Sequence, residues 1–201
     1  MPKTLSESER AYIKERLKTE TEKCLATYGI RKTTIDELVK RVGIPKGTFY
    51  LFYESKEQLL YEVIMESDKK AQEQLLQEVA SLPGVPDVDQ FTDIILRFYR
   101  QIDDSFLPRL MHSGELEYFM RTVPPEFSRQ HAERDQEAMQ KIFAAFPGMQ
   151  SERAAVLGAA FRGVFMTLLF KDEIGAEIFE DALRVLVRGV VMQMAEQQDK
   201  Q

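Results

Sequence analysis

The sequence predicts an all-α protein in which a small N-terminal domain, residues 7–65, precedes a larger helical domain, residues 66–201. Three observations support this fold class. Apolar residues recur at intervals of three and four along most of the chain, which is the spacing of one helix face. Several of these stretches start at a capping-box pattern. Glycine or proline separates each stretch from the next, and signals for strands are few.

The first helix is expected over residues 6–28. Ser6 and Glu9 form a capping box, in which the two side chains satisfy free backbone N–H groups at the helix start. Gly29 is expected to end the helix, because glycine tolerates the left-handed conformation found at such ends. Cys24 is the single cysteine of the chain, so we interpret it as a small core residue. The apolar face comprises Ile13, Leu17, Cys24, Leu25 and Tyr28.

Two very short helices are expected next. Thr34 opens the first of them, because it lies three residues before Glu37 in another capping box. Gly43 permits the left-handed conformation that ends it. Pro45 suits a first helical turn, where no N–H is needed, so residues 46–53 are expected to form the second. The buried face of the first short helix comprises Ile35, Leu38, Val39 and Val42.

The next helix opens at a capping box formed by Ser55 and Gln58 and runs to about Ala80, across the expected domain boundary. Glycine and prolines in residues 82–86 break the chain after it. The remaining helices are expected at 87–104, 106–121 with a break near Ser113-Gly114, 125–146 ending at Pro147-Gly148, 151–171 and 175–197.

The N-terminal elements form a three-helix helix-turn-helix pattern, with two short helices joined by a tight turn. Proteins use this arrangement to place one helix in the major groove of DNA. The net charge of the chain is −6, but residues 31–56 hold six basic and three acidic residues, whereas residues 71–201 hold 13 and 21. A basic face on an acidic body would orient the protein on phosphate. A solvated helical surface is the alternative interpretation of this charge distribution alone.

A pattern of fixed spacing runs through residues 7–65. It comprises Tyr28-Gly29, Thr33-Thr34, Ile35, Leu38, Gly43-Ile44, Lys46-Gly47-Thr48, Tyr50, Ser55-Lys56-Glu57 and Leu59-Leu60. This pattern resembles the TetR family of bacterial repressors, and its specificity comes from the agreement of many positions. Two departures occur. Pro45 stands where the recognition helix of the family often starts with Ser, and Phe52-Tyr53 reverses the usual order of an aromatic pair.

The resemblance implies which residues contact DNA. It makes Lys46 and Gly47 the tip that enters the groove, where Lys46 could reach a guanine edge or a phosphate. The phosphate contacts that it implies are Thr34, Thr48, Tyr50 and Lys56. The full set of expected DNA-binding residues is Thr33, Thr34, Pro45, Lys46, Gly47, Thr48, Tyr50, Leu51 and Lys56. Taken singly, Thr34 could be only a helix cap, Tyr50 only a packing residue and Lys56 only a solvated lysine.

The last two helices are more apolar than one core face requires. Gly158, Gly163 and Gly189 also lie in them, each at a cost of about 1 kcal/mol relative to Ala, and close approach of helices could explain these glycines. The resemblance implies that the two helices of each subunit form a four-helix dimer interface. The expected interface residues are Leu157, Phe161, Val164, Phe165, Leu168, Leu183, Val187, Val190, Val191 and Met194. An ordinary buried hairpin within one subunit is the alternative.

The resemblance also implies a ligand pocket in the middle helices. Thirteen Phe and nine Met would supply adaptable apolar walls, so a small lipophilic effector, neutral or cationic, is expected. Arg97, Arg100 or Arg121 turned inward would instead select a carboxylate. The expected lining residues are Phe98, Tyr99, Ile102, Met111, Tyr118, Phe119, Phe143, Phe161 and Phe165. Any one of them could equally be an ordinary core residue.

Enzymatic function is not expected. The only histidines, His112 and His131, lack metal-ligand spacing, and the chain has no glycine-rich phosphate loop and no nucleophile elbow. No metal or cofactor, no signal peptide and no membrane span are expected, which suggests a cytoplasmic protein. The sequence therefore predicts a homodimeric transcriptional repressor, released from a near-palindromic operator by its effector. The alternative is a helical interaction or ligand-binding protein that does not bind specific DNA.

Overall fold

The computed structural model describes residues 5–84, 86–144, 146 and 151–195, which divide into two units. The first unit comprises the chain up to Ser67 together with the later segment Arg109–Pro124. The second unit comprises Asp68–Pro108 and the chain from Pro125 onward. The described residues are helical, as the sequence predicted. The expected domain boundary at residues 65–66 lies close to Ser67. The segment Arg109–Pro124 was assigned to the larger domain from the sequence, but in the structure it packs with the first unit.

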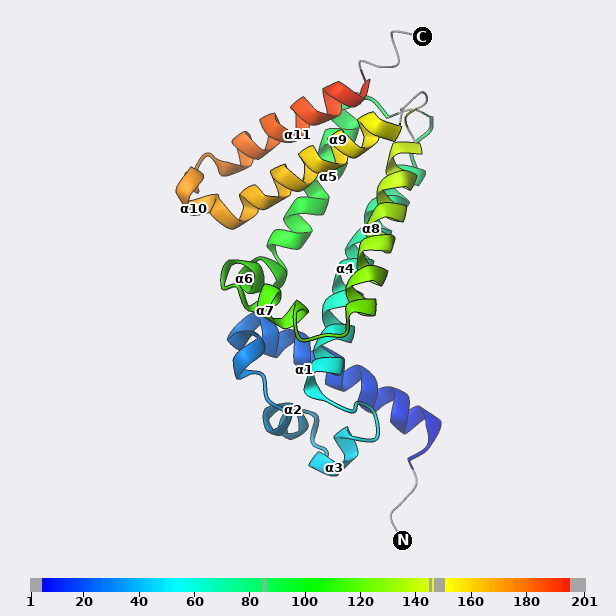
Figure 1. Ribbon diagram of the computed structural model, residues 1–201, viewed down its shortest axis with the longest axis vertical. Coiled ribbons are helices and arrows are strands. Elements are labelled where there is room, and N and C mark those ends of the chain that lie inside the picture. The colour runs from blue at the N-terminus through cyan, green and yellow to red at the C-terminus, as the bar shows by residue number, and fades with distance from the viewer. Residues whose placement is uncertain (1–4, 85, 145, 147–150, 196–201) are drawn as a thin grey trace. The chain divides into compact units, whose positions relative to one another are not determined.

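The first helix of the first unit, α1 (Glu7–Lys32), begins at the expected capping box (Figure 1). The Glu9 N–H donates to Ser6 Oγ at 3.2 Å, and the Ser6 N–H donates to Glu9 Oε2 at 2.8 Å. Gly29 has φ 77° and ψ −175°, which interrupts the helix. The interruption is where the sequence predicted an end, but helical structure continues beyond it to Lys32.

The second helix, α2 (Ile35–Val42), is capped at both ends as predicted, although only half of its capping box forms. The Glu37 N–H donates to Thr34 Oγ1 at 3.2 Å. The Glu37 carboxylate instead accepts from Arg41 Nε at 2.6 Å. Gly43 adopts the left-handed conformation at φ 79° and ψ 36°, and its N–H donates to the Val39 carbonyl at 2.9 Å.

The third helix, α3 (Lys46–Phe49), is shorter than the expected span of 46–53, and Pro45 is its cap rather than its first residue. Beyond it the chain continues in tighter turns, with the Leu51 N–H bonded to the Thr48 carbonyl at 3.1 Å. Such i→i+3 bonds are common where a helix ends. The two short helices share a core with α1 and α4, formed by the fully buried side chains of Leu17, Leu25, Leu38, Phe49, Leu59 and Leu60.

The fourth helix, α4 (Lys56–Ala80), begins in the first unit and continues in the second. The Gln58 N–H donates to Ser55 Oγ at 3.1 Å, and the Gln58 side chain accepts from the Glu54 N–H at 2.8 Å. The expected capping box therefore closes one residue earlier than predicted. Two six-residue helices follow, α6 (Leu107–His112), of which the residues from Arg109 belong to the first unit, and α7 (Glu115–Met120), which lies wholly in it. They are separated at Ser113-Gly114 as predicted.

The second unit contains α5 (Val88–Asp103), α8 (Pro125–Ala144), α9 (Ser151–Met166) and α11 (Phe179–Ala195). The helix expected over 151–171 becomes a 3₁₀ turn at Thr167–Phe170 and a short α10 (Lys171–Ile174). Helix α11 packs beside α5 and α9 around a buried apolar cluster (Figure 1). The expected stop at Pro147-Gly148 lies outside the described residues.

One stretch, Arg153–Ile174, is long and apolar enough to cross a membrane by length and composition. No membrane-spanning stretch was expected from the sequence. Core helices of soluble proteins pass the same test, but only 28% of the most apolar window is buried inside the protomer. Much of the apolar surface of this stretch therefore remains uncovered within one chain.

Candidate nucleic-acid interface

The turn from α2 into α3 exposes the residues expected to meet DNA. Pro45, Lys46 and Gly47 are exposed, while Phe49, two residues later, is fully buried. Tyr50 and Leu51 follow with 52% and 57% of their surface exposed. The Tyr50 ring packs edge-on against Phe49, with 5.5 Å between ring centroids. A buried aromatic residue thus holds a short exposed tip in place.

Lys46 is paired with Asp36, which is not among the expected DNA-binding residues. Its Nζ lies 2.9 Å from the Asp36 carboxylate, and this hydrogen bond raises the pKa of Lys46 above its usual value. Both side chains are exposed, so the pair contributes little to stability and can exchange for a contact with phosphate or a base. Its spacing, from the first turn of α2 to the start of α3, has no simple sequence signature.

The three threonines expected to contact DNA differ in their surroundings. Thr34 is exposed and caps α2, and Thr48 is half-buried. Thr33 is fully buried, and its hydroxyl donates to the Gly29 carbonyl at 2.7 Å. In this structure Thr33 therefore does not reach the exposed surface, and its expected DNA contact is not available. The reason is that its hydroxyl satisfies a carbonyl freed by the break in α1.

Lys56, an expected phosphate ligand, is the first residue of α4. Its Nζ donates to the Ile30 carbonyl at 3.2 Å. A lysine ammonium has three donors, so this bond leaves donors for a phosphate. Lys56 therefore lies where the end of α1 meets the start of α4, and one of its donors is used in a structural bond.

Arg41 carries a network that fixes α2 on α1. Its guanidinium donates to Glu37 at 2.6 Å and to the Tyr28 hydroxyl at 3.2 Å, and it also lies over the Tyr28 ring. Arg16 donates to the Arg41 carbonyl at 3.2 Å. The buried carboxylate of Glu20 lies 3.8 Å from Arg41, and its hydrogen bond from Lys23 lowers the pKa of Glu20. In the sequence, Arg41 stands out only as one of the six basic residues of 31–56.

The helices expected to form a dimer interface present different residues from those predicted. All the expected interface residues except Phe165 and Val190 are buried in the protomer's own core cluster, and those two pack against it. Within the single chain these side chains are therefore covered by the chain's own helices and are not exposed to a partner. The residues that α9–α11 leave exposed are Val156, Met166, Phe170, Ile174, Ile178, Val185, Leu186 and Met192.

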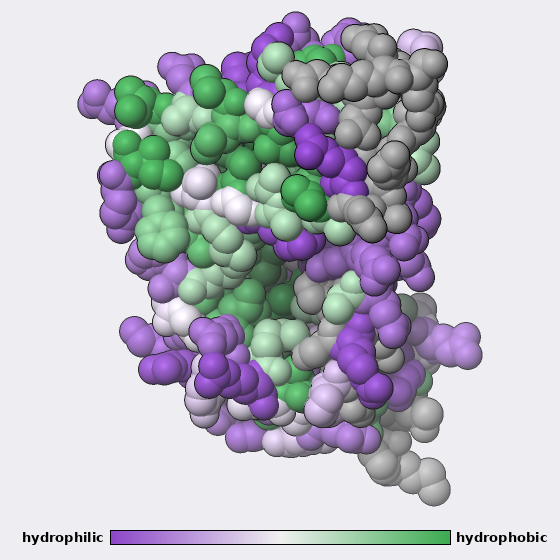
Figure 2. Space-filling model, turned by 45° about the horizontal axis from the view of Figure 1, so that its top comes forward, coloured by the Kyte–Doolittle hydropathy of each residue, from purple (hydrophilic) through white to green (hydrophobic). Residues whose placement is uncertain are grey.

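We call the exposed apolar residues of α9–α11 the outer face, and some of them are regularly spaced. Val156, Gly163 and Phe170 are seven residues apart, and so are Ile178, Val185 and Met192. Hydrophobic side chains gather on the face of the molecule where these helices lie (Figure 2). A Cβ added at Gly163 or Gly189 would meet no atom within 4 Å, so no described part of the protomer approaches these glycines.

The residues expected to line an effector pocket belong to both units. Met111, Tyr118 and Phe119 belong to the first unit, and the others belong to the second. Tyr99, Phe143 and Phe161 are buried in the core cluster of the second unit, with Phe98 and Phe165 packed against it, and Ile102 is also buried. The Tyr99 hydroxyl donates to the Phe161 carbonyl at 2.7 Å, and burial raises the pKa of Tyr99.

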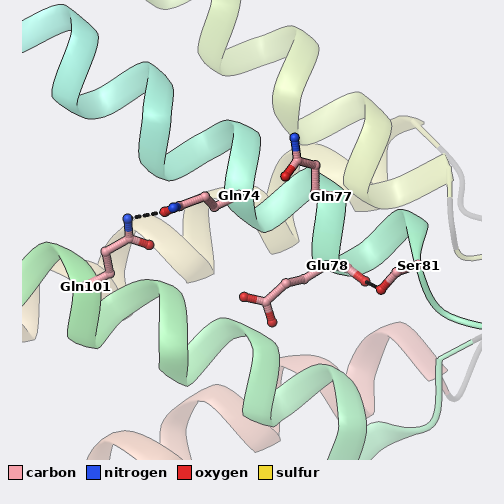
Figure 3. A pocket seen from close by; sticks show the side chains of 5 residues that line it. All are labelled: Gln74, Gln77, Glu78, Ser81 and Gln101. Atoms are coloured by element: carbon pink, nitrogen blue, oxygen red, sulfur yellow. Dashed lines mark hydrogen bonds between the residues drawn. The ribbon is translucent and has the colours of Figure 1, made fainter.

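An open cavity of about 530 Å³ lies between α4 and α5, but its lining is polar (Figure 3). Gln74, Gln77, Glu78 and Ser81 come from α4, and Gln101 comes from α5. Gln101 donates a hydrogen bond to Gln74. This cavity includes none of the apolar residues expected from the sequence, and its chemistry does not suit a lipophilic ligand.

Residues 19–63 match the sequence profile of the family described as bacterial regulatory proteins, tetR family. No curated protein matches the chain. Similar solved structures include a proposed TetR-family transcriptional regulator of Mesorhizobium loti MAFF303099, with 15% identity, a TM-score of 0.66 and coverage of 94% of this chain and 97% of that one. A regulator of the TetR/AcrR family from Thermobifida fusca shares 18% identity at a TM-score of 0.63, over 90% and 98% of the two chains.

A third similar structure is the fatty acid degradation regulator FadR of Bacillus halodurans, with 14% identity, a TM-score of 0.60 and coverage of 96% of both chains. At such identities the solved structures support the fold of the whole chain. The profile match over residues 19–63 identifies the kind of domain that carries the exposed tip.

Proposed function

We propose that this chain, whose residues 19–63 match the profile of the tetR family of bacterial regulatory proteins, represses transcription as a homodimer. Each subunit would place α3 in a major groove of a near-palindromic operator, with half-sites about one helical turn of DNA apart or a multiple of it. A small lipophilic effector would favour a conformation whose two reading heads no longer match that spacing.

The observation that carries the DNA-binding proposal is the exposed tip at Pro45–Gly47 on a buried support. Lys46 supplies a cation, Gly47 permits close approach of the backbone, and Tyr50 offers a hydroxyl to a phosphate. The α3 helix itself is too short to be stable alone, so its function depends on Phe49 and Leu38 beneath it.

Selection from a random-sequence duplex library with the full chain tests this proposal. We expect a near-palindromic consensus to be enriched. Lys46→Ala combined with Tyr50→Ala should abolish that enrichment, whereas Lys69→Ala, which removes one charge from α4 in the second unit, should not. If the wild-type chain enriches no sequence, the alternative function as a helical interaction or ligand-binding protein gains support.

The homodimer proposal is supported by the outer face of α9–α11. It exposes large apolar residues on α9 and α11, such as Val156, Val185 and Met192, and such a surface suits packing against a second pair of helices. Gly163 and Gly189 lower helix stability by about 1 kcal/mol each relative to Ala. Since neither is approached by the described protomer, a partner's helix would account for both. A two-fold interface would use the same face on each subunit.

Analytical ultracentrifugation of the wild-type chain tests this assembly. We expect a dimer at micromolar concentration. A monomer at that concentration would remove the basis for an operator with two half-sites. Because Arg153–Ile174 is also apolar enough for a membrane, flotation with lipid vesicles provides the comparison: co-flotation of the chain would argue for a lipid-covered face instead of a dimer.

The effector is proposed to bind within the aromatic cluster of the second unit, around Tyr99, Phe161 and Phe165. Buried apolar area would supply affinity, and a few polar groups would orient the ligand. FadR of Bacillus halodurans is named for fatty acid degradation, which concerns that protein. For this chain we propose a neutral or cationic lipophilic effector. A thermal-shift screen that responds to fatty acids and not to lipophilic cations would reverse this charge preference.

A further inference from the structure

The break in α1 at Gly29 leaves backbone groups that need other partners. In an uninterrupted α-helix the Ile30 N–H would donate to the Ala26 carbonyl, and the following N–H to the Thr27 carbonyl. At Gly29, φ 77° and ψ −175° turn the chain away from the helical path, so the Ile30 N–H cannot point back along α1. Buried backbone groups without partners are costly, so another part of the protein must satisfy them.

Both sides of this break are satisfied by the segment that carries α6 and α7. Arg109 Nη1 donates to the Ala26 carbonyl at 2.5 Å and to the Thr27 carbonyl at 2.7 Å. The Glu115 carboxylate accepts from the Ile30 N–H at 2.6 Å. The Arg109 cation thus donates to the freed carbonyls, and the Glu115 anion accepts from the freed N–H. Such charge-assisted hydrogen bonds are stronger than those between neutral groups.

Glu115 also fits the shape of the break. A Cβ placed at position 29 would clash with the Glu115 carboxylate, so this acid occupies the space that glycine leaves open. The same segment reaches the residue after Ile30, because the Arg31 guanidinium lies over the Tyr118 ring at 5.9 Å from its centroid. Arg109 and Glu115 lie more than forty residues beyond the matched N-terminal domain of 19–63, yet they pack within the first unit.

The two carbonyls at the break, those of Gly29 and Ile30, are bonded to residues that adjoin α2 and start α4. The Gly29 carbonyl accepts from the Thr33 hydroxyl, and the Ile30 carbonyl accepts from Lys56 Nζ. Thr33 precedes the residue that caps α2, and Lys56 starts α4. The conformation of residues 29–33 therefore sets how α2 and α3 leave α1, and that conformation depends on partners from residues 109–115.

We propose that Arg109 and Glu115 are positioning residues for DNA recognition: they replace the hydrogen bonds broken at Gly29 and thereby fix the orientation of α2–α3 on α1. This inference rests on the proposed function of the chain as a sequence-specific DNA-binding protein. Neither residue contacts DNA in this proposal, and neither is part of the N-terminal motif.

A set of three variants of α7 tests the role of Glu115. Glu115→Ala removes the acceptor, Glu115→Gln keeps an acceptor of the same length, and Glu117→Ala removes an exposed acid from the same helix as a control. Affinity is measured for the duplex that the wild-type chain selects and for a shuffled duplex, each at several salt concentrations. Hydrogen exchange of the Ile30 amide and the melting temperature are measured on the free proteins.

Glu115→Ala should weaken binding to the selected duplex roughly tenfold, which is the cost of leaving one buried group unsatisfied, and should speed exchange at Ile30 by a similar factor. Its affinity for the shuffled duplex and its salt dependence should match the wild type, because no phosphate contact is lost. Glu115→Gln and Glu117→Ala should behave like the wild type. Arg109→Ala, which frees the two carbonyls, should reproduce the loss of specific binding.

Two results would overturn the inference. One is an unchanged affinity of Glu115→Ala for the selected duplex, which would leave the proposed function intact. The other is an equal loss on both duplexes with a collapsed melting transition, which would assign Glu115 to general stability. If the wild-type chain selects no duplex, the proposed function fails instead, and exchange at Ile30 still decides whether Glu115 holds the break.

Discussion

The α2–α3 region and the α9–α11 region were both recognised from the sequence, but only the first was recognised down to the orientation of its residues. In α2–α3 the residues expected to be exposed, such as Lys46 and Tyr50, are exposed, and Leu38 is buried as expected. In α9–α11 helices formed within the predicted ranges, with a 3₁₀ turn at Thr167–Phe170, but Leu183 and Val187, expected at a partner's surface, are in the protomer's core.

The difference comes from the number of apolar faces on each helix. Helix α2 has one apolar stripe and charged residues elsewhere, so only one orientation buries its apolar side chains. Helix α11 has the buried apolar residues Leu183, Val187 and Val191 and the exposed apolar residues Val185, Leu186 and Met192. Either face could be placed inward by its composition alone, so packing against α5 decides which one is buried.

The largest expected effect distinguishes the two faces of α11. Val187 is fully buried and Val185 is 71% exposed, although only two residues separate them. Val187→Asp should lower the free energy of unfolding by about 3–5 kcal/mol, because it buries an unpaired charge. Val185→Asp should leave the fold of the protomer intact. Urea denaturation measures both, and equal destabilisation by the two variants would contradict the assignment of faces.

The second effect concerns the link between the outer face and DNA. Val185→Asp should dissociate the dimer, and affinity for the selected duplex should fall on the order of a hundredfold, because two linked heads bind far better than one. Sedimentation and DNA titration are read on the same samples. Arg188→Ala, on α11 beside the outer face and paired with Asp89, serves as the control that should keep the dimer. Retention of the dimer by Val185→Asp would place the interface elsewhere.

The third effect tests whether the exposed tip of α3 reads sequence. If Lys46 contacts a base edge, Lys46→Ala should cost about 1–3 kcal/mol of discrimination at one base pair of each half-site. Repeating the duplex selection with the variant would show relaxed preference at that position only. A loss of affinity that is uniform across sequences would make Lys46 a phosphate ligand instead.

The fourth effect separates the two roles that Lys56 can have. If Lys56 binds a phosphate, Lys56→Ala should flatten the dependence of log affinity on log salt by about one unit. Tyr50→Phe, which removes a neutral donor, should weaken binding by about 0.5–1.5 kcal/mol without changing that slope. If Lys56→Ala leaves the slope unchanged but lowers thermal stability, Lys56 is not a phosphate ligand. Its role is then the structural bond to the Ile30 carbonyl.

The smallest effect concerns the ion pair that holds Lys46. Asp36→Asn removes a negative charge beside the tip and frees Lys46, at a stability cost of about 0.2–1 kcal/mol for an exposed pair. Affinity for shuffled DNA should rise more than affinity for the selected duplex, so specificity should fall. Competition titration with the two duplexes measures the ratio, and an unchanged ratio would show that Asp36 does not guide Lys46.

The sequence by itself determined the all-α class and the positions of most helices, and it predicted a DNA-binding N-terminal domain. These depend on local signals: the caps at Ser6 and Thr34, the left-handed Gly43, and the single apolar face of α2. Each of these signals acts over a few residues, so the sequence contains it directly. The match over residues 19–63 agrees with that prediction.

Only the tertiary structure decided which face of α9 and α11 is buried, why Thr33 is turned inward, and how Arg109 and Glu115 reach α1. Each of these depends on residues far apart in the chain. Glu115 lies 85 residues from Ile30 in the sequence. It can accept a hydrogen bond from the Ile30 N–H only because Gly29 breaks the helix and frees that group. The local spacing of residues does not predict this contact, because the contact depends on how α7 packs against α1.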